Sequence, residues 1–183
     1  MNKKVLYIAG IATVLGFVLS NVAEAKSDVR TVSSVDLNQY KGNWYEIAKF
    51  PNRFQRKCSS NTTANYSLKE NGRIEVLNQC TKENGEVTKA IGEAKVADKT
   101  TNSKLKVRFA PGFLSFIPFV WADYWIIDLD QNYKYAVVGT PDKDYLWILS
   151  RTPTLDETTY QGIISRAKAQ GFDINRLEKT VQK

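Results

Sequence analysis

The chain has 183 residues, with 26 lysines and arginines against 19 aspartates and glutamates, a net charge of +7, and no histidine. The absence of histidine excludes histidine acid–base chemistry, Ser-His and Cys-His nucleophile pairs and nearly all histidine metal sites. The cations are scattered, with no run of five or more, so the charge predicts attraction to anionic surfaces such as membrane leaflets and not a nucleic-acid footprint.

The first 25 residues are expected to be an export signal and not a part of the fold. Two lysines precede an apolar run over residues 5–18, and Ala23-Glu24-Ala25 supplies the small residues that signal peptidase recognises. The run is shorter than the ~20 residues that a membrane-spanning helix needs, although an uncleaved anchor is the alternative. We expect cleavage after Ala25, one domain over residues 26–183, and residence in the periplasm or the medium. No cysteine lies near the cleavage site, so association with the outer membrane is left open but is not expected to use a lipid-anchored cysteine.

After this segment the chain divides into short runs of alternating apolar and polar residues. Asn71-Gly72 is suited to a two-residue type I′ hairpin turn, and Asn84-Gly85 marks another tight turn. Short loops and an absence of intervening helices predict an all-β fold, as a closed up-and-down barrel or a sandwich. The eight expected strands are residues 44–50, 62–69, 73–81, 87–96, 104–109, 121–129, 133–140 and 145–151.

One helix is expected after the strands, over about residues 155–170. Thr154 and Glu157 form a capping-box pattern at its start, and Gly171 suits a left-handed C-cap. A short ninth strand is expected near residues 177–181. The apolar stripe of the helix is expected to pack against the outside of the barrel, and its members are Tyr160, Ile163, Ile164 and Ala167.

The alternation of apolar and polar residues also predicts which side chains of the strands face the inside of the barrel. Five of its residues are alanine or glycine, which predicts a cavity, although small residues that merely fit the barrel taper are the alternative. Asn78 and Glu46 could supply polar groups for the head of a ligand. The inward residues are Ala64, Tyr66, Leu68, Ile74, Val76, Ala90, Gly92, Ala94, Leu105, Val107, Phe109, Tyr124, Ile126, Ala136, Val138, Trp147 and Leu149.

Cys58 and Cys80 are the two cysteines of the chain. In an oxidising compartment we expect a disulfide between them, with a pair of unlinked buried thiols as the alternative. An ideal turn at Asn71-Gly72 would pair residues whose numbers sum to about 143, whereas the cysteine numbers sum to 138. The disulfide therefore requires a bulge or a bend before the second strand.

Three segments resemble the lipocalin family. Gly42-Asn43-Trp44-Tyr45 matches its G-x-W signature, Asp123-Tyr124-Trp125 resembles its T-D-Y motif with Ala122 in place of threonine, and Arg151 follows the eighth strand as its third motif does. The resemblance implies an eight-stranded antiparallel barrel with one helix packed outside, and Arg151 stacked on Trp44 to close the barrel base. The phrases around Trp44 and Arg151 are most similar to the bacterial lipocalin, apolipoprotein D and plant temperature-induced lipocalin branch.

Members of that branch bind fatty acids, lysophospholipids and similar lipids and are tied to membrane maintenance. The resemblance therefore implies a non-enzymatic lipid binder or carrier of the cell envelope, without a cofactor. Whether it forms oligomers is left open. The residues expected to contact the ligand are Ala64, Tyr66, Val76, Asn78, Val107, Phe109, Tyr124 and Trp147.

Residues 110–121 form an uncharged apolar segment interrupted by two prolines and a glycine. It joins the fifth and sixth strands, at the end that is open in lipocalins. We hold two alternatives for its aromatic residues Phe113, Phe116 and Phe119: a rim that touches lipid or a partner, or a lid buried in the barrel mouth.

Two other function classes are weighed against the carrier. A lipid-modifying enzyme on the same barrel would have to use Cys58, Cys80, Glu46 or Tyr124, because no histidine is present. An envelope interaction protein would act through the segment 110–121. A haem protein is disfavoured by the missing histidine ligand, although a tyrosine ligand is not excluded.

Overall fold

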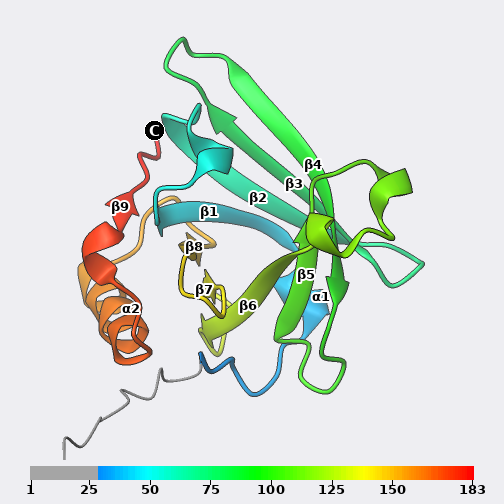
Figure 1. The fold of residues 1–183 in the computed structure, drawn as a ribbon. Coiled ribbons are helices and arrows are strands. Elements are labelled where there is room, and N and C mark those ends of the chain that lie inside the picture. The colour runs from blue at the N-terminus through cyan, green and yellow to red at the C-terminus, as the bar shows by residue number, and fades with distance from the viewer. Residues whose placement is uncertain (1–28) are drawn as a thin grey trace, which may run out of the picture.

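The computed structural model describes residues 29–183, so the expected export signal lies outside the described residues. Nine strands form one antiparallel sheet in the order β2-β3-β4-β5-β6-β7-β8-β1-β9, and β1 also pairs with β2, which closes the barrel (Figure 1). The strands are β1 (Gly42–Lys49), β2 (Ser60–Leu68), β3 (Ile74–Thr81), β4 (Val87–Val96), β5 (Lys104–Arg108), β6 (Ala122–Leu129), β7 (Tyr135–Gly139), β8 (Leu146–Ser150) and β9 (Glu178–Lys179).

The all-β barrel with one C-terminal helix is therefore confirmed, and so is a short ninth strand. β1 pairs with β2 only over its first half, and β9 takes up its second half at Ala48 and Lys49. The chain after β9 continues beside β2. There the amide of Asn61, in β2, donates to the carbonyl of Val181 at 2.8 Å. The C-terminal segment thus fills the gap where β1 and β2 separate.

The two ends of the barrel differ. Since consecutive strands are antiparallel, the segments 50–59, 82–86, 109–121 and 140–145 all lie at one end. At the other end the short helix α1 (Leu37–Tyr40) precedes β1, with Asp36 as its N-cap. The Trp44 indole donates to the carbonyl of Tyr40 at 2.8 Å, so α1 is fixed across this end. We refer to these as the open end and the closed end.

Two apolar cores follow from the alternation in the strands. One lies inside the barrel and includes Trp44, Ile126 and Val138, and the other lies between the outer face of the barrel and helix α2 (Glu157–Ala169). Figure 1 shows α2 against the outside of the barrel, beside β8 and β9. The expected stripe faces this second core: Tyr160, Ile163 and Ala167 are buried and Ile164 is partly buried.

The helix start differs from the expected capping box. Asp156 is the N-cap, and its carboxylate accepts from the amide of Thr159 at 2.8 Å, so Thr154 lies outside the helix. An aspartate is a stronger N-cap than a threonine and lies one residue before the first helical turn. Gly171 follows the helix with φ +84°, as expected for a C-cap glycine.

The first hairpin turn also differs from the expected one. Leu68 pairs with Ile74, and the turn between them contains Gly72 at φ +75°, so the loop is one residue longer than a type I′ turn. The disulfide between Cys58 and Cys80 is confirmed, with Cα atoms 5.5 Å apart. The required irregularity is a register shift between Ser60 and Thr63.

Candidate functional site

The closed end is sealed by Arg151 and Trp44. The guanidinium carbon of Arg151 lies 3.8 Å from the centroid of the indole ring. All three guanidinium nitrogens donate to backbone carbonyls, those of Gln39, Tyr40, Lys41, Asn43 and Tyr133. The lumen therefore has a rigid floor, because α1, β1 and the β6–β7 connection are all held by one side chain.

Three phenols meet above this floor. The hydroxyl of Tyr124 lies 2.7 Å from that of Tyr40 and 2.9 Å from that of Tyr66, so α1, β2 and β6 are joined across the lumen. Burial raises the pKa of Tyr66 to about 12 and holds the pKa values of Tyr40 and Tyr124 well above the ordinary 10.0. All three hydroxyls are therefore neutral donors at physiological pH.

The phenols border an apolar pocket inside the barrel. It contains about 350 Å³ of space not filled by atoms, which includes space open to solvent. Little of that space is enclosed, and the exposed residues of its lining, Lys41 and Leu68, lie at the closed end beside α1 and the β2–β3 turn. The lining residues are Leu37, Tyr40, Lys41, Tyr66, Leu68, Ile74, Val76, Ala94, Leu105, Val107 and Tyr124.

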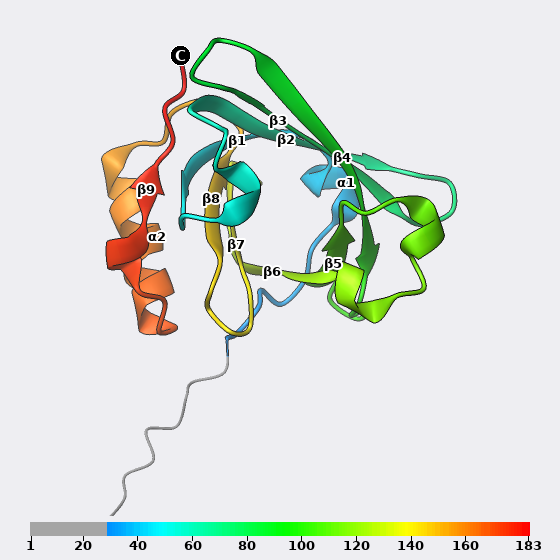
Figure 2. The same ribbon diagram turned by 45° about the horizontal axis from the view of Figure 1, so that its top comes forward.

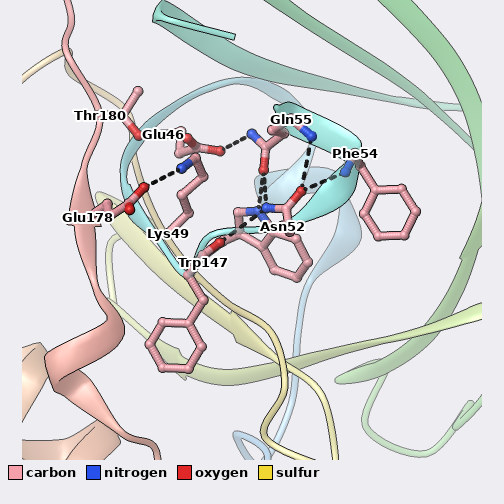
Figure 3. Close-up of polar contacts among 9 residues, drawn as sticks. Glu46, Lys49, Asn52, Phe54, Gln55, Trp147, Glu178 and Thr180 are labelled. Atoms are coloured by element: carbon pink, nitrogen blue, oxygen red, sulfur yellow. Dashed lines mark hydrogen bonds and ion pairs between the residues drawn. The ribbon is translucent and has the colours of Figure 1, made fainter. Parts of the chain in front are cut away.

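A second polar cluster lies nearer the open end, around the carboxyl group of Glu46. Figure 3 shows the Gln55 side chain between Glu46 and Trp147. The Gln55 amide donates to Glu46 Oε2 at 2.5 Å, and the Trp147 indole donates to Gln55 Oε1 at 3.0 Å. Thr180 donates to Glu46 Oε1 at 2.6 Å. The network fixes the short helix η1 (Arg53–Gln55) and the C-terminal segment to the mouth of the barrel.

The Glu46 carboxyl is 3% exposed. Burial raises its pKa above the ordinary 4.5, while the hydrogen bonds from Thr180 and Gln55 and the charge of Lys49 oppose this shift. Lys49 itself forms an ion pair with Glu178 at 3.2 Å. Glu46 is therefore a buried acidic group whose partners are all supplied by the protein.

Most of the residues assigned to the inward face lie in the core inside the barrel, and Leu68 lines the pocket although it is 40% exposed. Two of the assigned residues, Phe109 and Ala90, are exposed near the open end, although the register places them on the same face of the sheet as Gly92 and Val76. Phe109 is 45% exposed, and its ring lies 2.7 Å from where a Cβ on Gly92 would be, so it fills the space that we expected Gly92 to leave. Ala90 is exposed. Asn78 Oδ1 is buried without a hydrogen-bond partner among the described residues.

The segment 110–121 does not enter the barrel, so the lid alternative is wrong. Phe113, Phe116 and Phe119 are 75%, 80% and 97% exposed. Figures 1 and 2 both show the segment outside the barrel wall, on the side away from α2. It contains the short helices η2 (Gly112–Leu114) and η3 (Pro118–Val120).

Trp121 anchors the base of this segment to the outer face of the barrel. Its indole donates to the carbonyl of Ser115 at 2.8 Å, and Lys95 Nζ lies 4.3 Å from its ring centroid. Arg108 packs on the same ring at 5.1 Å and pairs with Glu93 at 2.7 Å. These contacts occupy the side of the segment next to the strands, which leaves the phenylalanines directed away.

Two residues missed by the sequence analysis belong to these clusters. Tyr40 lies in a segment without alternation, and the only sequence signal is that Asp36 can cap a short helix there. Gln55 lies in a loop between strands, where no local pattern indicates that it contacts Glu46. Of the four residues considered for catalysis, the two cysteines are joined in the disulfide and are inert as nucleophiles.

A match to a known protein family shows which family the chain belongs to. Residues 35–182 match the lipocalin-like domain family. The chain is a lipocalin. It is 44% identical over 159 residues to temperature-induced lipocalin-1 of Arabidopsis thaliana, covering 86% of this chain and 84% of that protein. It is 41% identical over 151 residues to the outer membrane lipoprotein Blc of Vibrio cholerae, covering 81% and 84%. Apolipoprotein D of Macaca fascicularis is 36% identical over 154 residues, covering 80% and 77%.

Solved lipocalin structures share the fold. Insecticyanin from the tobacco hornworm Manduca sexta aligns with a TM-score of 0.66 and 26% identity over 84% of each chain. Lobster apocrustacyanin A1 aligns with a TM-score of 0.63 over 86% of this chain and 92% of the other, and at 17% identity this likeness concerns the fold alone. Lipocalins bind small hydrophobic ligands and are in general not enzymes.

Proposed function

We propose that this lipocalin binds a single-chain lipid, a fatty acid or a lysophospholipid, in its barrel and carries it within the cell envelope without chemical change. The observation that carries the proposal is the apolar pocket inside the barrel, bordered by the phenols of Tyr40, Tyr66 and Tyr124. The name of one relative, apolipoprotein D, supports a ligand of this class.

The proposed contact residues lie along the path from the floor to the mouth. Tyr66, Val76, Val107 and Tyr124 border the pocket. Trp147 is partly buried at the mouth and stacks on Tyr145 with ring centroids 5.7 Å apart. Ala64, Asn78 and Phe109 complete the set proposed from the sequence, the last as part of the rim because it is largely exposed.

Displacement of a fluorescent probe tests this function. N-phenyl-1-naphthylamine bound to the purified protein is titrated with lysophosphatidylcholine, with the expectation of displacement at about one lipid per barrel. Val76→Phe fills the pocket and is expected to weaken lipid binding at least tenfold. Leu77→Phe is the matched control, since the adjacent residue on the same strand faces outward. Equal binding by the two variants would contradict a site inside the barrel.

We further propose that the segment 110–121 docks the open end on an anionic membrane surface while lipid enters or leaves. Three exposed phenylalanines form an apolar patch of the kind that marks an interaction site. The segment 50–59 at the same end carries three exposed cations, Arg53, Arg56 and Lys57, which suit lipid phosphates.

Co-sedimentation with phosphatidylglycerol vesicles tests the docking. Phe116→Ser/Phe119→Ser is expected to abolish most of the bound fraction, and Ile91→Ser is the control because Ile91 is 69% exposed on the outer face of β4. Binding of the double variant at the wild-type level would rule out the apolar patch as the docking surface and favour a protein partner.

We also propose that the protein is exported and keeps its disulfide in an oxidising compartment. No helix within residues 29–183 is long and apolar enough to span a membrane. Mass spectrometry of the protein recovered from its own cells is expected to give a chain that starts at Lys26. An intact N-terminus on the recovered protein would contradict cleavage.

A further inference from the structure

The three phenols above the floor have one more hydrogen-bond donor than the hydrogen bonds between them can use. Tyr40, Tyr124 and Tyr66 carry one O–H proton each, and the two hydrogen bonds between them use two. Within residues 29–183 these hydroxyls have no other hydrogen bond, so one O–H lacks an acceptor. A buried donor without an acceptor is unfavourable, and an oxygen atom that enters the pocket would relieve it.

The charged groups around the phenols leave no buried cation for an anionic ligand. Arg151 acts on Tyr40 from below the floor, but its guanidinium is fully engaged with backbone carbonyls on the other side of Trp44. Glu46 is the charged group that acts on Tyr66. Lys41 lines the pocket, yet it is exposed at its edge.

Among ligands with the same hydrocarbon chain, these surroundings favour an uncharged head group over a charged one. A carboxylate that reached the phenols would give up its hydration, meet no buried cation and lie on the same side of the floor as the Glu46 carboxyl. An uncharged ester or hydroxyl oxygen accepts the free phenol proton at a much smaller desolvation cost.

We propose that the phenol chain of Tyr40, Tyr124 and Tyr66 is the polar anchor of the ligand site and selects an uncharged oxygenated lipid, an ester or an alcohol, over the fatty-acid anion of the same length. This inference rests on the proposed function and narrows its ligand. Tyr124 is the central member, because both hydrogen bonds of the chain end on its hydroxyl.

The selectivity is measured first on the unaltered protein. Methyl palmitate, 1-hexadecanol and palmitate compete for bound N-phenyl-1-naphthylamine at pH 7.5, with lysophosphatidylcholine as the reference ligand for the proposed function. The ester and the alcohol are expected to compete at concentrations about tenfold lower than palmitate. Palmitate that competes as well as the ester would overturn the inference and leave lipid binding intact. Failure of all four lipids to compete would overturn the proposed function itself.

Tyr124→Phe then tests the anchor. The variant leaves the hydroxyls of Tyr40 and Tyr66 each without an acceptor, so it is expected to raise the ratio of ester to palmitate affinity severalfold, whereas general loosening of the barrel would weaken both ligands alike. Tyr135→Phe is the matched control, since its hydroxyl contacts Arg166 outside the barrel. An unchanged ratio in Tyr124→Phe would refute the role of the phenol chain. Near-ultraviolet circular dichroism establishes that the variant is folded, and if it is not, the ratio in the unaltered protein decides alone.

Discussion

At the scale of single residues, Arg151 makes contacts that a lysine could not reproduce. Its planar guanidinium lies on the Trp44 ring and donates to carbonyls of α1, β1 and the β6–β7 connection. A lysine ammonium has three donors on one atom and cannot reach such separated acceptors together. The lost contacts would leave the part-buried carbonyl of Tyr133 without this partner and the Trp44 ring uncovered.

Arg151→Lys is therefore expected to lower the free energy of unfolding by about 2–4 kcal/mol, as measured by urea denaturation. Arg56→Lys is the control, because Arg56 is exposed in the loop between β1 and β2, and it is expected to change stability by less than about 0.5 kcal/mol. If the two variants were equally stable, the closed end would not depend on the guanidinium.

Glu46 gives a prediction for pH. Its pKa is raised by burial, so the folded state holds the proton more readily than the unfolded state. Stability contributed by Glu46 is therefore present below the ordinary pKa of 4.5 and is lost as the pH rises through the higher folded pKa. Compared with Glu46→Gln, the unaltered protein is expected to lose stability as the pH rises above 4.5 in urea denaturation series. Parallel stability curves would contradict a raised pKa.

At the scale of elements, α2 depends on its apolar stripe. Ile163 is fully buried between the helix and the outer face of the barrel. Ile163→Ala is expected to cost about 3 kcal/mol of unfolding free energy, because the helix cannot collapse onto the cavity without leaving the sheet. Ile91→Ala is the exposed control and is expected to cost much less. A small effect of Ile163→Ala in denaturant would mean that α2 is dispensable for the fold.

The disulfide joins the loop after η1 to the end of β3. Cys58→Ser/Cys80→Ser is expected to lower stability by roughly 3 kcal/mol, since the bond closes a loop in the unfolded chain. Thermal unfolding followed by circular dichroism measures the change. Addition of a reductant should destabilise the native protein similarly and leave the double variant unaffected, and a response of the variant to reductant would indicate another cause.

The elements that the sequence could predict are those with local patterns. Alternation marks each strand to within a few residues, and the apolar period of α2 places its buried face. The irregularities follow from contacts between distant residues: the register shift near Asn61 depends on the disulfide and on Val181, and the extra loop residue at Gly72 depends on the strand register. Neither the register shift nor the longer loop can therefore be predicted from the local sequence alone.

Part of the candidate site could also be predicted from the sequence, because local alternation shows which strand residues face inward. Tyr66, Val76, Val107 and Tyr124 lie on alternating strands, so their inward direction can be deduced from periodicity. Tyr40 and Gln55 lie outside the strands, and only the closed barrel brings them to Tyr124 and Glu46. The ring of Phe109 fills the space beside Gly92, which periodicity alone could not indicate.

At the scale of the whole molecule, the barrel has one end sealed by a stacked arginine and the other end bordered by exposed apolar and basic side chains. In the proposed function a ligand would enter at the open end, beside the segment 110–121, and would reach the phenols farther inside the barrel. A lipid extracted from a membrane would pass the exposed phenylalanines before it reached the lumen. The fold thus connects the proposed docking surface to the proposed ligand site.

The measurement that tests lipid binding most directly is native mass spectrometry of the protein purified from its own cells, followed by extraction and identification of bound lipid. We expect one single-chain lipid per barrel, lost in Val76→Phe and retained in Leu77→Phe. A protein that is recovered empty, and that binds no added single-chain lipid, would contradict this expectation.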